Sequence, residues 1–234
     1  SYSVNTTSGV SIVTYVGNGT AAHTIPHHLG VAPSVVICKS RSENRGWPMQ
    51  HKSLASAAYT AYISAEVGTS ANAPNNGTNS WNSTAASSSV VTLGNDANNN
   101  KNDDSYIMYS FAEVKGFSKF SSYNGTNNAD GPYVFCGFKP AFVFMKDIVN
   151  DGSQWRIVDS ARDSYNDGYA KTFANTTEAE RNIAHSGQDF LSNGFKFQGT
   201  GNNDGNVNGA NKVIFMAFAE QPFVTSTGVP ATAR

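Results

Sequence analysis

Charged residues are scarce in this chain of 234 residues, since Asp, Glu, Lys and Arg together make up only 14% of it, well below the usual quarter. Its 16 basic and 17 acidic residues leave a net charge of −1 and form no basic cluster. Nucleic acids and anionic membranes bind to clustered Lys and Arg, so neither partner is expected. No apolar run approaches the roughly 18 residues that span a bilayer. We therefore expect no membrane insertion.

Cysteine is also scarce, and both Cys38 and Cys136 lie in apolar runs that predict buried strands. We expect two free thiols that pack as small hydrophobic side chains, with a disulfide between them as the alternative. Neither has a second Cys or a His at zinc-ligand spacing. Asp and Asn gather at residues 147–167 without the spacing of an EF-hand. No cofactor is expected, and calcium in such loops is the alternative.

The motifs that mark common catalytic sites are missing as well. The glycine clusters precede no helix and so predict turns instead of phosphate sites. There is no Gly-x-Ser-x-Gly element and no Cys/His pair. We predict no catalytic residue and no metal ligand, and expect that the protein is not an enzyme.

A repeated pattern is the clearest positive feature of the sequence. PSVVICK at residues 33–39 returns as PAFVFMK at 140–146, and SFAE at 110–113 returns as AFAE at 217–220. Both pairs are 107 residues apart (140 − 33 and 217 − 110). The simplest interpretation is an internal duplication, with one repeat over residues 1–117, a second over 118–223 and an irregular tail over 224–234.

Short apolar runs separated by Asn, Gly and Ser predict the architecture of each repeat. Residues 35–38, VVIC, have the length and unbroken apolarity of a strand covered on both faces. Residues 106–112 alternate with a period of two, which indicates a strand with two distinct faces. We expect a polar lead-in over 1–11 and one helical turn at 177–183. The predicted fold is all-β, with two tandem antiparallel β-sandwich domains of jelly-roll-like form.

The long polar tract at residues 68–89 predicts a loop that is either functional or stabilised by a partner, because such a loop is costly to order inside a compact domain. Residues 94–105 predict a second polar loop. Trp81 lies in the first tract, either as an anchor for the loop or as a ring on which a sugar stacks. Amide side chains beside it and in the second tract offer hydrogen bonds. The predicted ligand-binding residues are Trp81, Asn82, Asn98 and Asn99.

These motifs together resemble a repeat-containing domain that is common in predicted tail-fibre and other virion proteins of marine tailed phages. The segments that carry the resemblance cover nearly the whole chain: GNGT (17–20), HHLGVAPSVVICKSR (27–41), WNST (81–84), YIMYSFAEVKGFSKFSSYNG (106–125), DGPYVFCGFKPAFVFMK (130–146), DFLSNGF (189–195), FMAFAEQPF (215–223) and GVPATAR (228–234). In the HGLG-like turn, His28 replaces an expected glycine.

The resemblance implies a protein on the surface of the extracellular virion, assembled as a homo-oligomer, with a trimer expected from the usual symmetry of phage fibres. The leading hypothesis is a tail-fibre or receptor-binding domain whose loops, 75–89 and 98–105, contact host surface glycan. The alternative is a non-catalytic structural module, for capsid decoration or fibre attachment, that binds only other phage chains. A third hypothesis, a glycan-cleaving enzyme, would need a cleft with two close carboxylates.

Overall fold

The computed structural model describes residues 1–63, 80–149, 153–162, 170–182, 187–199, 206 and 211–221. These residues form almost entirely antiparallel β-structure, which confirms the predicted all-β fold class. The chain divides into two compact units, Ser1–Glu113 and Val114–Arg234. The predicted tail, 224–234, lies outside the described residues.

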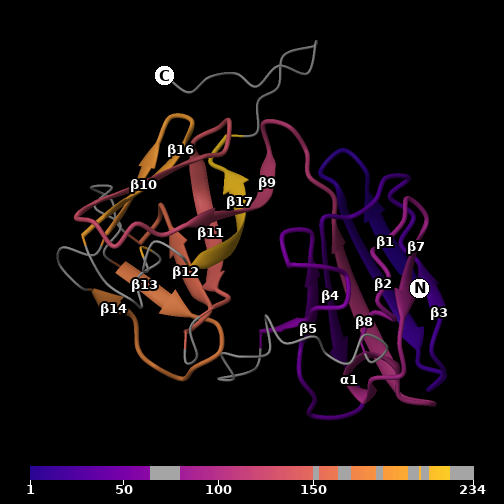
Figure 1. Cartoon of the computed structure of the whole chain (residues 1–234). Coiled ribbons are helices and arrows are strands. Elements are labelled where there is room, and N and C mark those ends of the chain that lie inside the picture. Colours follow the sequence, from indigo (N-terminus) through magenta and orange to yellow (C-terminus); the bar gives the residue numbers. More distant parts are fainter. Residues whose placement is uncertain are drawn as a thin grey trace. The chain divides into compact units, whose positions relative to one another are not determined.

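The first unit contains a six-stranded sheet and a two-stranded sheet. The larger sheet has the order β1-β2-β8-β4-β5-β6, and the smaller one pairs β3 with β7 (Figure 1). The elements are β1 (Tyr2–Asn5), β2 (Val10–Val16), β3 (His23–Pro26), β4 (Val35–Ser40), β5 (Pro48–His51), β6 (Ala61–Tyr62), β7 (Val90–Leu93), the short helix α1 (Ala97–Asn100) and β8 (Ser105–Phe111).

The second unit contains a six-stranded sheet in the order β14-β13-β12-β11-β17-β9 and a three-stranded sheet in the order β10-β16-β15. Figure 1 shows β9, β17 and β11 side by side in this unit. The elements are β9 (Ser118–Asn124), β10 (Asp130–Phe135), β11 (Pro140–Asp147), β12 (Arg156–Asp159), β13 (Ala170–Phe173), β14 (Arg181–Asn182), β15 (Gln188–Leu191), β16 (Gly194–Gln198) and β17 (Lys212–Ala219).

Each unit is a sandwich because its two sheets bury apolar side chains against one another. Strands expose alternate residues on opposite faces, so one face of each sheet supplies the core. In the first unit the buried cluster is Val13, Ile25, Val36, Cys38, Trp81, Val91, Leu93 and Met108. In the second it is Val134, Cys136, Phe138, Val143, Met145, Val158, Phe190, Phe195, Phe197, Val213, Phe215 and Ala217. Both cysteines are free and buried.

The large sheets of the two units share the order of five strands, since β2-β8-β4-β5-β6 of the first matches β9-β17-β11-β12-β13 of the second. Their central strands also share a register. Val35 of β4 lies opposite Phe111 of β8, and Phe142 of β11 lies opposite Phe218 of β17. Both members of the second pair follow those of the first by 107 residues. This agreement is what a duplicated unit would produce, while the duplication itself stays a prediction from the sequence.

Two local predictions were wrong. The expected polar lead-in contains a strand, because β1 pairs with β2 along its whole length. The expected helical turn at 177–183 is absent from its described part, residues 177–182, which ends in β14. Arg181 pairs instead with Lys171 of β13, so the cross-strand hydrogen bonds outweigh the local helical preference of this segment.

The turn with an unexpected histidine adopts the backbone that glycine favours. His28 has φ of +60°, in the left-handed region that is costly for residues with a Cβ. Its ring stacks on Tyr2 with the ring centroids 4.2 Å apart. Such a contact contributes about 0.5–1.5 kcal/mol, which offsets part of the strain.

Candidate functional site

Trp81, the predicted sugar platform, is a core residue. Its side chain is 1% exposed and packs in the cluster between the two sheets of the first unit. Within the described part of the chain its indole Nε1 has no hydrogen-bond partner. A buried ring has no free face for a ligand, so the prediction of a stacking platform is wrong and the loop-anchor interpretation describes Trp81.

The predicted asparagines of the second tract, Asn98 and Asn99, make hydrogen bonds within the protein. Asn99 is fully buried, and its Nδ2 donates to the carbonyl of Ser80 at 2.8 Å. Asn98 accepts the backbone N–H of Gly46 at 3.0 Å and donates to the Asp96 carboxylate at 2.9 Å. Asp96 also caps the N-terminus of α1 by accepting from the backbone of Asn98.

Asn100, which sequence reasoning did not single out, is the centre of this amide network. It is fully buried. Its Nδ2 donates to the carbonyls of Gly94 at 2.6 Å and Thr20 at 2.9 Å, and its Oδ1 accepts the backbone N–H of Asn18 at 2.9 Å. One amide side chain thus joins the turn at 17–20 to the loop at 94–100.

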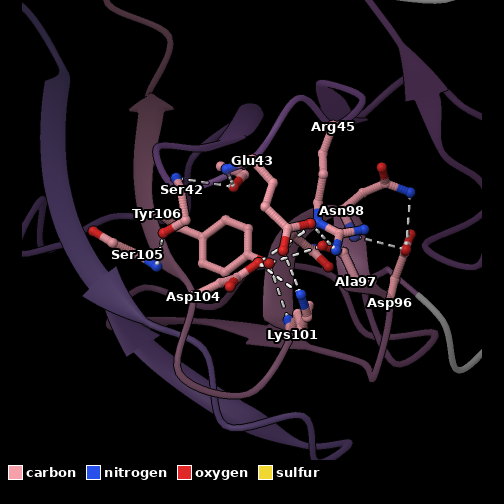
Figure 2. A network of polar contacts seen from close by, with 12 residues as sticks. Ser42, Glu43, Arg45, Asp96, Ala97, Asn98, Lys101, Asp104, Ser105 and Tyr106 are labelled. Atoms are coloured by element: carbon pink, nitrogen blue, oxygen red, sulfur yellow. Dashed lines mark hydrogen bonds and ion pairs between the residues drawn. The ribbon is translucent and has the colours of Figure 1, made fainter.

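A set of charged groups lies beside the amides. Figure 2 shows the Glu43 carboxylate between Arg45 and Lys101, and it pairs with both. Asp104 lies 3.6 Å from Arg45 and 3.8 Å from Lys101. The Tyr106 hydroxyl donates to the carbonyl of Ala97 at 2.8 Å. These contacts pair the charges with one another, which indicates a structural role.

Asn82 lies apart from these groups in a turn. Its φ of +51° is in the left-handed region, where Asn is better tolerated than most residues. Its carbonyl accepts from the Thr84 hydroxyl at 2.8 Å. The four predicted residues therefore do not meet on one surface: Trp81 and Asn99 are buried, Asn98 anchors α1, and Asn82 lies half-buried in its turn.

A different surface gathers exposed aromatic and polar side chains: the outer face of the sheet β10-β16-β15. Val134, Phe195, Phe197 and Phe190 point inward, because they belong to the core. The residues that alternate with them point outward. The register places Tyr133 opposite Lys196 and Lys196 opposite Asp189. The next outward row consists of Phe135, Gly194 and Leu191.

Two aromatic rings stand out from this face. Tyr133 and Phe135 are 46% and 62% exposed, and they are two residues apart on β10. The Tyr133 hydroxyl donates to Oδ1 of Asn193 at 2.6 Å, so the ring is held in place. Partial burial raises the pKa of this hydroxyl above its ordinary value, so it stays protonated and able to donate at a higher pH than a fully exposed tyrosine. Tyr133 is thus a ring fixed by a hydrogen bond, and Phe135 beside it is the more exposed of the two rings.

The opposite end of the face is polar and hollowed. A hollow of about 420 Å³ is lined by residues that include Asp130, Asp189, Lys196 and Gln198. Lys196 pairs with Asp130, and the Gln198 amide donates to Asp189. The volume falls in the range of small-ligand sites. An aromatic end and an end with hydrogen-bonding groups thus adjoin on one sheet.

Gly194 lies at the aromatic end, in the row of Phe135 and Leu191. A Cβ at this position would lie 2.1 Å from the carbonyl oxygen of Val134 on the neighbouring strand. Real Cβ atoms do not approach backbone that closely, so β10 and β16 require glycine here. Phe135 and Leu191 therefore flank bare backbone.

This face offers aromatic rings and hydrogen-bonding groups to a ligand. No three His, Cys, Asp or Glu side chains come together to hold a metal ion in the described ranges. The carboxylates of Asp130 and Asp189 are both engaged by neighbouring side chains. Rings with free faces and carboxylates that accept hydrogen bonds suit a ligand with both C–H faces and hydroxyls.

Sequence reasoning missed this face although a signal was present. The apolar run at residues 133–136, which ends at Cys136, predicts a buried strand. A period of two within it separates Tyr133 and Phe135 from Val134, so two large rings must share one face. In a sandwich the outer sheet turns one face to solvent, which would have placed the rings there.

The fold is that of an all-β protein of two antiparallel sandwich units, and the outer face of β10-β16-β15 in the second unit is the candidate site. In the residues that the structure describes, no helix is long and apolar enough to cross a membrane. The chain belongs to a family described as a domain of unknown function, DUF7483, whose model matches residues 1–222. No curated protein and no solved structure matches it.

Proposed function

We propose that the protein is a non-catalytic glycan-binding domain on the surface of a phage virion, most simply a tail-fibre or receptor-binding domain that contacts host surface glycan. The observation that carries the binding role is the pair of exposed rings, Tyr133 and Phe135, beside the polar hollow. Sugars present an apolar C–H face and polar hydroxyls, and both halves of this surface complement them.

The virion location and the trimeric assembly rest on the resemblance of the sequence motifs. The alternative, a structural module that binds only other phage chains, would use the same exposed rings as a contact between proteins, since aromatic residues are enriched in such contacts. The hollow with its hydrogen-bonding groups favours the glycan, because a contact between proteins needs no such cavity.

The test measures binding of the purified protein to intact host cells, with and without periodate oxidation of their glycans. We expect saturable binding that oxidation abolishes. Phe135→Ala is expected to weaken it about tenfold, or ~1.4 kcal/mol, because a ring contact contributes about 0.5–1.5 kcal/mol and the buried area adds to it. Tyr2→Ala, which removes an exposed ring of the first unit, is the matched control and should bind normally.

Two outcomes would contradict the proposal. Equal binding by Phe135→Ala and the wild-type protein would remove this face from the site. Binding that survives periodate, or no binding by a folded and assembled sample, would favour the structural module, and the next step would be to identify the phage chain that it contacts.

A further inference from the structure

The charges around the hollow set which glycans can enter it. Three charged side chains line it among the described residues: Asp130, Asp189 and Lys196. Lys196 is neutralised by its ion pair with Asp130. Asp189 is held by the neutral amide of Gln198. The described residues that line the hollow therefore carry one negative charge without a cation partner.

The polar groups of the hollow are suited to accept hydrogen bonds. An ionised carboxylate only accepts, whereas a sugar hydroxyl both donates and accepts. The Asp130 side chain is 81% exposed, so its oxygens remain accessible beside the ion pair. A hydroxyl group can donate to them. A ligand carboxylate or phosphate has no proton to donate and meets like charge.

The strongest contacts to an anionic sugar come from an unpaired cation, above all an arginine with its paired donors, and backbone N–H groups can also hold an anion. Among the described residues that line the hollow, Lys196 is the only cation, and it is already paired with Asp130. We infer that this face binds neutral glycans and rejects glycans that carry carboxylate or phosphate groups. The inference rests on the proposed glycan-binding function.

The test compares matched oligosaccharide probes, one neutral and the other with a uronic or sialic acid at one residue, by calorimetry. We expect the neutral probe to bind at least about tenfold more tightly at an ionic strength of about 0.01 M. The difference should shrink at about 0.5 M, because salt screens exposed charges. Phosphorylated probes should behave like the carboxylated ones.

A substitution then separates charge from shape. Asp189→Asn keeps the size of the side chain and removes the uncompensated charge, so the ratio of acidic to neutral affinity should rise several-fold. Asp103→Asn makes the same chemical change in a turn of the first unit, where the residue is exposed and has positive φ. The ratio of acidic to neutral affinity in Asp103→Asn should equal the ratio in the wild-type protein.

The outcomes distinguish this inference from the proposed function. If acidic probes bind as tightly as neutral ones and Phe135→Ala weakens both, the glycan site stands and the charge selection is wrong. If neither probe binds to a folded sample, the glycan function fails and the selection fails with it. An unchanged ratio in Asp189→Asn would also overturn the role of this carboxylate.

Discussion

Replacement of Trp81 by alanine distinguishes a core residue from a ligand platform most sharply. The indole is 1% exposed and packs among buried side chains of both sheets of the first unit. Truncation of a buried Trp to Ala costs about 3–5 kcal/mol, because the lost burial adds to the cost of the cavity. Total stabilities of domains are about 5–15 kcal/mol, so the loss is a large fraction.

The size of the effect can be measured by urea unfolding followed by circular dichroism. With a slope of about 2 kcal/mol per M, a loss of about 4 kcal/mol lowers the midpoint of the first unit by roughly 2 M. Trp81→Phe should cost much less. It keeps a ring in the core, and it removes a buried N–H without a described partner, whose burial itself costs about 1–3 kcal/mol.

Trp47→Ala is the control, because that ring is only half-buried and lies under Lys39, whose Nζ is 5.7 Å from the ring centroid. A midpoint for Trp81→Ala within about 0.3 M of the wild-type value would refute the core role. If the same variant also lost glycan binding while it stayed folded, Trp81 would be the sugar platform that the sequence suggested.

Two further predictions concern buried reactive groups. Burial raises the pKa of Cys38 to about 12, and Cys136 is buried too. Neither thiol should react with Ellman's reagent in the native protein, both should react in denaturant, and rapid native labelling would contradict their burial. Burial lowers the pKa of His27, whose Nδ1 accepts from Leu29 and whose Nε2 lies 3.1 Å from the Ser87 carbonyl oxygen. The neutral form of His27 stabilises the fold fully above the unfolded-state pKa of about 6.5, and this contribution is lost as pH falls toward the lower folded-state pKa, by at most ~1.4 kcal/mol per pH unit. His27→Gln should therefore reduce the slope of the unfolding free energy against pH below about pH 6.5. An unchanged slope would exclude His27 as the source of this pH dependence.

The strands could be predicted from the sequence because burial imposes a pattern on neighbouring residues. Residues 35–38 are all buried within β4, as their unbroken apolarity indicated. In β8 the buried residues alternate with partly exposed ones from Ser105 to Phe111. Pairing partners across long separations, such as β2 with β8, are not encoded in any local pattern.

The candidate site was harder to predict, because burial of a polar residue depends on partners that are distant in the chain. Asn99 bonds to Ser80, 19 residues earlier, and Asn100 bonds to Thr20, 80 residues earlier. A polar tract with such partners becomes part of the interior, whereas the same composition without them would be solvated. Composition could not distinguish these cases. It placed the predicted ligand-binding residues in the polar tracts and not at Tyr133 and Phe135.

The amide network around Asn100 has a consequence for the media in which the protein keeps its structure. Amide and carbonyl groups do not ionise in the physiological range, and hydrogen bonds between buried neutral groups are not weakened by dissolved salt in the way that exposed ion pairs are. The bonds that Asn100 makes to Gly94, Thr20 and Asn18 should therefore hold alike in fresh water and in brine. In this end of the first unit the amide network should therefore keep its strength at any salinity, whereas the neighbouring exposed ion pairs of Glu43 with Arg45 and Lys101 should weaken as salt is added.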